Sequence, residues 1–355
     1  MRVLLIAASA ASLALAGLAP AYAQPAPASP SATQAGAVTG AERREVVEAL
    51  AKALQSRFVF PEIGARYAAM LRAKLASGAY DGLSDPEGFG KAVTADLQAV
   101  WPDGHLRLAP AADFQAARPP PTAADAPAST RPAGPPGLEE TKMIGDVAYL
   151  RFNAFFGEPA QVKAARAFLL AHAGAKAVII DARPNRGGGL DEMNAILPLL
   201  YSKRTTLVRM DTRAAIDSPL EQSPYLVRRA SPPDVVRHDH VITPDAAEHR
   251  LQHAPVYYLT SRRTASAAEH LALAFKRTHR ATLIGETTRG AGHYGGLETI
   301  GSRFAAFIPV GRSYDPATGW DWEGKGVAPD VAVPADMALE EALKEARAAG
   351  AHPTS

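Results

Sequence analysis

The amino-acid sequence predicts an α/β protein in which a small helical domain precedes a mainly parallel sheet built from βαβ units. Three observations lead to this prediction. From Met143 onward short apolar runs alternate with helical segments, whereas residues 39–108 show helical periodicity alone. Between them lies an Ala/Pro-rich stretch, residues 110–136, with the composition of a linker. The length of 355 residues fits two domains of roughly 100–200 residues each.

The first 23 residues are expected to be a secretory signal peptide (1–23). Arg2 is followed by the apolar stretch Val3–Leu18 and by Ala21-Tyr22-Ala23, a small-residue cleavage site. The apolar stretch, about 16 residues, is shorter than the roughly 20 that span a bilayer, and an uncleaved anchor is the alternative. Residues 24–40, rich in Ala, Pro and Ser, predict a disordered tether. We expect an exported protein, periplasmic or secreted, without a membrane span after signal cleavage.

Residues 41–109 predict the helical domain. Its first helix has apolar residues at spacings of three and four: Val46, Val47, Leu50, Leu54 and Phe58. Two more amphipathic segments follow at residues 65–76 and 85–100, separated by glycines and a proline. A Pro/Ala-rich linker is then expected over residues 110–140.

The α/β core is expected over residues 141–348. Apolar runs predict four buried strands, at residues 146–152, 175–181, 255–260 and 281–285. Helical patterns lie between or after them, at residues 159–172, 189–201 and 265–278, and a further strand and helix follow at 303–310 and 337–348. The polar, proline-punctuated region 205–253 predicts a strand followed by a long surface excursion.

Composition excludes several kinds of chemistry. The chain has no Cys, which rules out disulfides, thiolate zinc sites and a cysteine nucleophile. With 38 Lys and Arg against 36 Asp and Glu, it gives no electrostatic reason to expect a nucleic-acid partner. His238-x-His240 lacks a third nearby ligand pattern, so neither a metal nor another cofactor is expected. No feature specifies an oligomeric state.

Two predicted strand ends carry candidate site residues, because ligands of open α/β sheets bind beyond the carboxyl ends of the strands. After the strand that ends at Asp181 comes a glycine-rich turn with Gly187 and Gly188, which opens a helix. Its N–H groups suit a developing oxyanion, or a phosphate, although no phosphate-binding motif is present. A purely structural glycine turn is the alternative.

The other strand end leads to Ser266, which precedes a predicted helix. Ser266 is a candidate nucleophile, while Ser266-x-x-Glu269 is equally a capping box. A nucleophilic serine needs a base, for which His105 is the first candidate and His293 the rival. The sequence contains no G-x-S-x-G and no Ser-x-x-Lys, so it matches neither an α/β-hydrolase nor a penicillin-binding protein.

Taken together, these residues resemble the S41 peptidases, the family of the C-terminal processing proteases, the tricorn core and the interphotoreceptor retinoid-binding protein. The resemblance covers about residues 42–108 and 141–347 and rests on five segments in family order. They are Gly145–Arg151, Asp181–Gly188, Thr264–Glu269, Arg280–Thr287 and Gly324–Asp330. The resemblance implies a crotonase/ClpP-like fold for the βαβ core and a peptide or unfolded protein as substrate.

The resemblance also implies a branch and a mechanism. In processing proteases a Lys lies twenty-five positions after the nucleophile, where this chain has Ala291, and no PDZ segment is evident. The tricorn-like branch takes its base from an upstream His, matching His105, and an acidic residue that matches Glu323. Its Ser before that His is here Gly104, so the link from that Ser to the acidic residue is broken, or is made by water or Asp103.

The implied reaction is acyl transfer by a serine-type peptidase. Ser266 attacks, His105 accepts its proton, and Glu323 acts indirectly on the imidazolium. Backbone N–H groups of Ala267 and of Gly187 or Gly188 form the oxyanion hole. Two alternatives stay open: a catalytically weak or inactive protein that binds an apolar ligand or peptide, and a crotonase-type acyl-CoA enzyme. The signal peptide argues against the second, because acyl-CoA is not expected outside the cytoplasm.

Overall fold

The computed structural model describes residues 36–116, 137–216 and 223–351. The predicted signal peptide, most of the tether and most of the linker lie outside these residues. Helix α1 (Gly40–Arg57) begins at the last residue of the predicted tether. The Thr39 hydroxyl caps this helix, accepting the N–H of Glu42, and Val38 is buried. Among the described residues, no helix is both long and apolar enough to cross a membrane.

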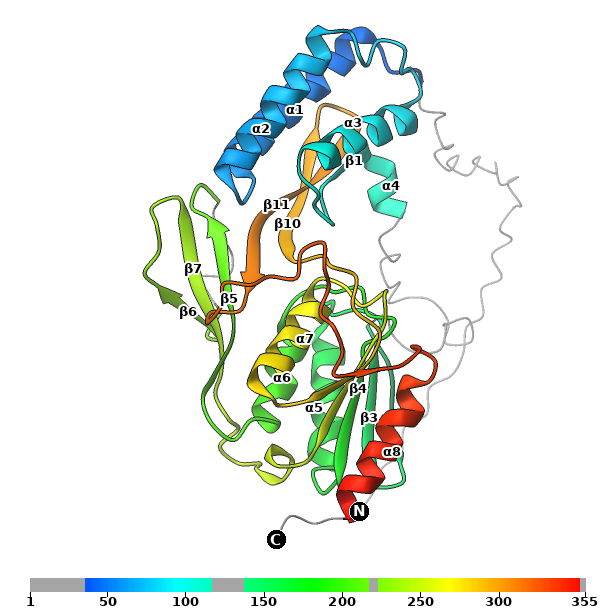
Figure 1. Cartoon of the computed structure of the whole chain (residues 1–355), viewed down its shortest axis with the longest axis vertical. Helices are drawn as coiled ribbons and strands as arrows, with labels where there is room; N and C mark the ends of the chain where they lie inside the picture. The colour runs from blue at the N-terminus through cyan, green and yellow to red at the C-terminus, as the bar shows by residue number, and fades with distance from the viewer. Residues whose placement is uncertain (1–35, 117–136, 217–222, 352–355) are drawn as a thin grey trace, which may run out of the picture. The chain divides into compact units, whose positions relative to one another are not determined.

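Three helices open the described chain: α1, α2 (Pro61–Ala76) and α3 (Pro86–Val100) (Figure 1). Proline at the first helical position starts both α2 and α3, and the Asp85 side chain caps α3 through the N–H of Gly88. Strand β1 (Arg107–Pro110) then pairs antiparallel with β11 (Phe304–Tyr314), far along the chain. The apolar faces of the helices therefore share one core with residues of β11.

A mainly parallel sheet forms the α/β core. Its strand order is β12 (Val331–Ala332), β9 (Thr282–Gly285), β8 (Val256–Thr260), β4 (Ala177–Asp181), β3 (Val147–Phe152) and β2 (Leu138–Ile144). Only β2 runs antiparallel to its neighbour. Successive side chains of β3 enter two different apolar clusters, which places one core on each face of the sheet. The predicted strands of this sheet are thus present, and the protein has a mixed α/β fold.

Helices cover both faces of this sheet. One cluster includes residues of α5 (Pro159–Ala171), α6 (Asp191–Ile196), the short 3₁₀ helix η2 (Leu197–Leu199) and α7 (Ala267–Thr278). The other cluster includes residues of α8 (Ala338–Ala351), drawn in red in Figure 1. Because each apolar strand face meets an apolar helix face, the central strands β4 and β8 are buried at every residue, as their continuous apolar sequences predict.

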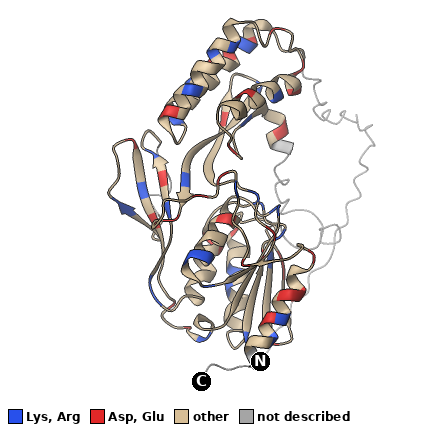
Figure 2. Cartoon of the chain, in the orientation of Figure 1, with Lys and Arg blue, Asp and Glu red and all other residues tan. Residues whose placement is uncertain are grey.

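Three strands of an antiparallel sheet come from residues 205–253, which were predicted as one strand followed by a surface excursion, and the predicted excursion is wrong. The sheet has the order β1, β11, β5 (Thr205–Arg213), β7 (Val235–Ile242) and β6 (Leu226–Arg229), and β10 (His293–Ile300) also pairs with β11. Ion pairs such as Arg237 with Asp211 and Arg209 with Asp239 join its strands, both at 2.7 Å. Figure 2 shows basic and acidic residues along the strands β5 and β7. Ion pairs of this kind explain the polar sequence.

The described ends of the predicted linker, residues 110–140, also carry structure. Helix α4 (Ala111–Ala116) follows β1 directly, and β2 begins at Leu138. The Leu138 N–H donates to Oε1 of Gln161 on α5, and the side chain is buried in the main core. Neither element could be predicted from the local composition, because long-range pairing and packing determine both.

Candidate active site

The loops after β4 and β8 lie together because these two strands are parallel neighbours. The Ser261 hydroxyl donates to the carbonyl of Arg183 at 2.6 Å, and the Ala265 N–H donates to the carbonyl of Asn185 at 3.0 Å. The glycine-rich turn and the predicted nucleophile thus come from two loops that are hydrogen-bonded along their length. This is the edge of the sheet where α/β proteins bind ligands.

Ser266 has a backbone conformation that few side-chain-bearing residues adopt. It precedes α7 with φ 56° and ψ −121°. A left-handed φ at a non-glycine residue costs on the order of 1–3 kcal/mol, and such residues concentrate at functional sites. The N–H of Ala267, first in the helix, donates to no acceptor within the described residues. Ser266 is therefore held on a sharp turn beside a free backbone donor.

Gly187 packs directly against this turn, and Gly188, next in the chain, packs against Phe155. A Cβ on Gly187 would lie 2.6 Å from Cβ of Ser266, and one on Gly188 would lie 1.9 Å from the carbonyl oxygen of Phe155. The Gly187 N–H is already engaged, donating to Oδ1 of Asn185 at 2.8 Å. The Gly188 N–H has no acceptor in the described chain. Of the two predicted glycine donors, only Gly188 is thus free to bind an oxyanion together with Ala267.

Glu269 holds this turn through a buried carboxylate. It accepts the N–H of Ser266 at 2.8 Å, so this half of the predicted capping box is present. It also accepts the N–H groups of Gly290 and Ala291 and the hydroxyl of Thr288, at 2.5–2.8 Å. Burial raises the pKa of Glu269, and the four hydrogen bonds oppose that shift. Glu269 thereby fastens the loop before β10 to the Ser266 turn.

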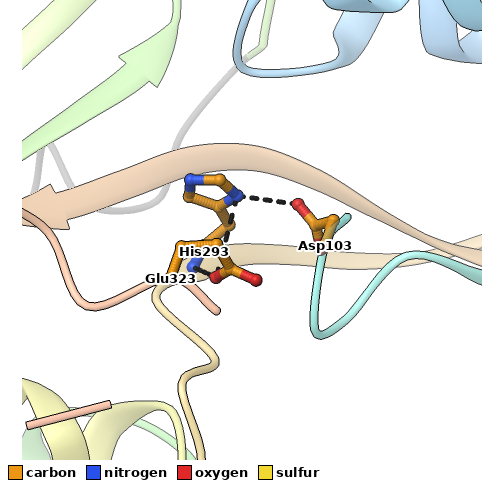
Figure 3. Close-up of side chains that lie close together, drawn as sticks. All are labelled: Asp103, His293 and Glu323. Carbon is orange, nitrogen blue, oxygen red and sulfur yellow. Dashed lines mark hydrogen bonds and ion pairs between the residues drawn. The ribbon is translucent and has the colours of Figure 1, made fainter. Parts of the chain in front are cut away.

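A second carboxylate cluster follows on the same loop (Figure 3). Nδ1 of His293 bonds to Oδ2 of Asp103 at 2.7 Å and lies 3.8 Å from Oε2 of Glu323. Burial by itself would lower the pKa of His293, but the hydrogen bond and charge of Asp103, with the charge of Glu323, outweigh it and raise the pKa. Burial opposes ionisation of Asp103 as well, yet His293 and two backbone N–H groups keep its pKa low. The two residues therefore form a buried ion pair.

The link at Gly104 is made by the backbone rather than by a side chain. The Gly104 N–H donates to Oε1 of Glu323 at 2.5 Å, while Oε2 of Glu323 accepts the N–H groups of Gly292 and His293. A Cβ on Gly104 would lie 3.2 Å from the same Oε1. Glu323 thus connects the turn before His105 to the loop that Glu269 anchors. Asp103, named above as a possible substitute for the missing Ser, contacts His293 instead.

His105 lies next to this turn, with its N–H donating to Oδ1 of Asp103 at 2.9 Å. Its ring stacks on Phe307, with the two ring centroids 5.1 Å apart. Burial lowers the pKa of His105 to about 4, the nearby Asp103 charge opposes this, and Arg289 and Arg107 add to it. His105 is therefore neutral at pH 7. Its Nδ1 is buried and bonds to no described group.

The structure brings the predicted residues into two groups. Ser266, Ala267, Gly187 and Gly188 form the first. The second contains the turn with His105, the loop with His293, and Glu323. Sequence reasoning missed the anchoring role of Glu269 and the pairing of Asp103 with His293. A signal for the latter was present, since Asp103 lies two residues before the predicted base.

One group of side chains has the spacing of metal ligands: ligand atoms of Asp103, His293 and Glu323 all lie within 4.8 Å of one another. Their oxygens already accept hydrogen bonds from His293 and from five backbone N–H groups. The atoms that could bind a metal are therefore already engaged in hydrogen bonds within the protein. In His238-x-His240, both ring nitrogens of His240 bond to protein groups, His270 and Asn194. These contacts leave His240 no ring nitrogen for a metal.

A cavity of about 330 Å³ opens beside Ser266. Gly188, Ser266 and Ala267 line part of it, and other lining residues come from α6, α7, the antiparallel sheet and the segment with Trp322. This volume is at the lower end of those that hold small ligands, roughly 300–1,000 Å³. The nucleophile candidate and the two residues with free N–H groups therefore line the same cavity.

The chain matches two family models. One, for peptidase family S41, matches residues 146–333, and the other, for the N-terminal domain of peptidase S41 in eukaryotic IRBP, matches residues 38–147. The first includes Ser266, Glu269, His293 and Glu323, and the second includes His105.

Solved structures of similar fold span nearly the whole chain. A putative peptidase from Parabacteroides merdae has a TM-score of 0.59 at 16% identity, covering 88% of this chain and 99% of its own. A photosystem II D1 C-terminal processing protease has a TM-score of 0.53 at 16% identity, with 83% and 94% covered. A lipoprotein from Streptococcus agalactiae has 0.52 at 13%, with 86% and 96% covered. The fold is shared with these proteins, and by its match over residues 146–333 the chain belongs to peptidase family S41.

Proposed function

We propose that this protein is an exported serine-type peptidase that hydrolyses peptide bonds through an acyl-enzyme on Ser266. The observation that carries the proposal is the Ser266 turn, with its left-handed φ of 56° and two free N–H donors, those of Ala267 and Gly188, beside it. Donors fixed at the site of charge development stabilise a tetrahedral oxyanion without reorganising. A helix cap alone requires neither the strained φ nor the adjoining cavity.

His105 is the proposed general base. A base must be unprotonated at the working pH, and the low pKa of His105, about 4, meets this condition. With its proton on Nδ1, the neutral ring presents the Nε2 lone pair. His293 is the weaker candidate, because its raised pKa favours the protonated form and its ring is only 2% exposed. Asp103 and Glu323 are proposed to position the His105 turn and to stabilise the imidazolium by their charge.

The proposed reaction has two acyl-transfer steps. Oγ of Ser266 attacks the substrate carbonyl carbon, its proton passes to His105, and the oxyanion is held by the N–H groups of Ala267 and Gly188. His105 then protonates the leaving nitrogen as the C–N bond breaks. Water, deprotonated by His105, attacks the acyl-enzyme and releases the carboxylate product and free Ser266.

The branch and the export are part of the proposal. Ala291 at the lysine position of the processing proteases, together with Glu323 and the match over residues 38–147, supports the branch of the tricorn core and the retinoid-binding protein. The N-terminal sequence, with its small-residue site at Ala21-Tyr22-Ala23, supports export. A mature protein that begins at Gln24 would establish cleavage. A crotonase/ClpP-like topology of the core and a small N-terminal helical domain are proposed on the same resemblance.

Fluorophosphonate labelling of the secreted protein, with mapping of the adduct, tests the mechanism. We expect a single adduct on Ser266 that is lost in Ser266→Ala and in His105→Ala and retained in His293→Ala. Hydrolysis of unfolded protein should fall at least about 10³-fold in the first two variants. Ser302→Ala, an exposed serine in the turn between β10 and β11, is the matched control. Loss in His293→Ala alone would make His293 the base.

A second candidate function is binding without hydrolysis. The observation that favours it is the unpartnered Nδ1 of His105, since serine hydrolases usually orient the base through that nitrogen. In that case Ser266 stays unlabelled, unfolded proteins are not cleaved, and solvent extraction of the purified protein releases an apolar ligand or peptide.

A further inference from the structure

The cavity beside Ser266 has two unlike parts. Its walls are largely apolar, formed by Leu190, Met210, Leu226 and the Trp322 indole, with Ala267 next to the serine. Its polar lining residues include Asn194 of α6, His270 of α7 and Ser313 of β11. These three residues are 8%, 3% and 3% exposed, so their hydrogen-bonding groups are largely withdrawn from bulk water. We call this group the polar floor.

The polar floor belongs to one chain of hydrogen bonds. Nε2 of His240 bonds to Oδ1 of Asn194 at 2.8 Å, and Nδ1 of His240 bonds to Nε2 of His270 at 2.9 Å. Nδ1 of His270 lies 3.3 Å from the Ser313 hydroxyl. Because an amide oxygen only accepts, His240 donates from Nε2 and accepts at Nδ1. His270 then donates from Nε2, and the Ser313 hydroxyl donates to Nδ1 of His270.

With the hydrogen bonds running in this direction, specific donor and acceptor groups of the polar floor remain available to a ligand. The Ser313 oxygen keeps lone pairs after its proton is used, and the Asn194 amide keeps its Nδ2 donors, which contact no acceptor among the described residues. Among the described residues, no Lys or Arg lines the cavity, and the single acidic lining residue, Asp191, is exposed. The floor thus offers one acceptor and one donor, and no cation to balance an anionic side chain.

We propose that this cavity receives the substrate side chain next to the scissile carbonyl, and that the polar floor selects an uncharged side chain with a polar tip, tyrosine above all. The proposal rests on the function proposed for Ser266, since Gly188, Ser266 and Ala267 line the same cavity and would hold the carbonyl. A tyrosine ring fits between the apolar walls, with its hydroxyl donating to Ser313 and accepting from Asn194. Phenylalanine leaves those buried groups unpaired, which weakens binding.

Peptides that differ only at this position test the preference. With Tyr, Phe, Leu, Glu or Lys before the scissile bond, we expect kcat/KM for Tyr to exceed that for Phe by about tenfold, and Glu and Lys to be the poorest. In Ser313→Ala the ratio of Tyr to Phe should fall to about one to two. Ser302→Ala is the matched control and should keep the wild-type ratio. Equal ratios in wild type and Ser313→Ala, or a preference for a charged side chain, would overturn the proposal.

A binding measurement separates this proposal from the proposed function. Ligand-observed NMR on full-length Ser266→Ala protein compares p-cresol, the tyrosine side chain, with toluene, the phenylalanine side chain. We expect p-cresol to bind more tightly, and the difference to vanish when Ser313→Ala is added. If fluorophosphonate labels Ser266 but p-cresol shows no advantage, the polar floor is not a selector although the peptidase stands. If p-cresol binds as expected while Ser266 stays unlabelled and unfolded proteins are not cleaved, the selector stands and the proposed hydrolysis is wrong.

Discussion

Two groups of buried histidines in this protein have opposite charge states. Burial lowers the pKa of His240 to about 3 and that of His270 to well below its ordinary value. His293 is as buried, at 2% exposure against 0% and 3%, yet its pKa is raised. The difference is the partner, because His240 and His270 contact each other and neutral groups, whereas His293 contacts Asp103 and Glu323. Contact with a carboxylate, more than burial, decides the charge.

Among the changes that test this contrast, removal of the Asp103 carboxylate should have the largest effect on stability. Asp103→Ala leaves His293 buried without its partner, and we expect the free energy of unfolding to fall by about 3–5 kcal/mol at pH 6. The folded pKa of His293 lies above its unfolded value of 6.5, so the pair contributes fully below pH 6.5 and less as the pH rises through the folded pKa. Because the pKa of Asp103 is lowered, this contribution is also lost in acid, below about 3.8.

Urea unfolding at pH 6 and pH 9 measures that loss. The difference between wild type and Asp103→Ala should be smaller at pH 9. Asp81→Ala, a matched change of an exposed carboxylate, should shift the midpoint little at either pH. An Asp103→Ala effect that is small, or the same at both pH values, would contradict the ion pair.

The same contrast predicts which histidine limits activity in acid. If His105 is the base, with a pKa of about 4, kcat/KM at pH 5 should remain at about 90% of its neutral value. If His293 is the base, its raised pKa, above 6.5, means that less than about 3% of it is unprotonated at pH 5. A pH profile of peptide hydrolysis between pH 4 and 8 distinguishes the two by about 30-fold. An acid limb with its midpoint above pH 6.5 would remove His105 from the mechanism.

Acid should also lower stability through the two neutral histidines, His240 and His270. The folded pKa values of His240 and His270 lie below 6.5, so the unfolded chain binds protons first and stability falls as the pH drops below 6.5. Each group contributes up to about 1.4 kcal/mol per pH unit. His240→Gln should therefore reduce the loss between pH 6 and pH 5 by about 1 kcal/mol, measured by urea unfolding. His253→Gln, at an exposed histidine, is the control; equal slopes in both variants would refute the assignment.

The sequence predicted the parallel sheet and the two loops at its edge better than it predicted the antiparallel sheet and the contacts of the candidate site. Strands such as β4 and β8 can be recognised from the sequence because their residues are continuously apolar. The loops with Ser266 and Gly188 lie together because neighbouring parallel strands end at the same edge of the sheet. The antiparallel sheet was not predicted, because Asp211 and Asp239 make its strands read as polar. The contacts of Glu269 and Asp103 join segments up to 190 residues apart, and no local pattern encodes such distances. The resemblance to S41 peptidases provided the order of the residues, but not their partners.

The smallest expected effect concerns Gly104, where the tricorn-like branch has a Ser. Gly104 already donates its N–H to Oε1 of Glu323, and an added Cβ would lie 3.2 Å from that oxygen and 3.1 Å from the carbonyl oxygen of Gly290. A serine hydroxyl would give Glu323 one more donor, at the cost of a shift of a few tenths of an ångström. We expect Gly104→Ser to change kcat/KM by no more than about threefold, because the link it restores exists through the backbone. Gly104→Ala, which adds the same Cβ without the hydroxyl, isolates the steric part. A rise of more than tenfold in Gly104→Ser alone would mean that the backbone N–H does not replace the missing hydroxyl, and that this chain is a weakened peptidase.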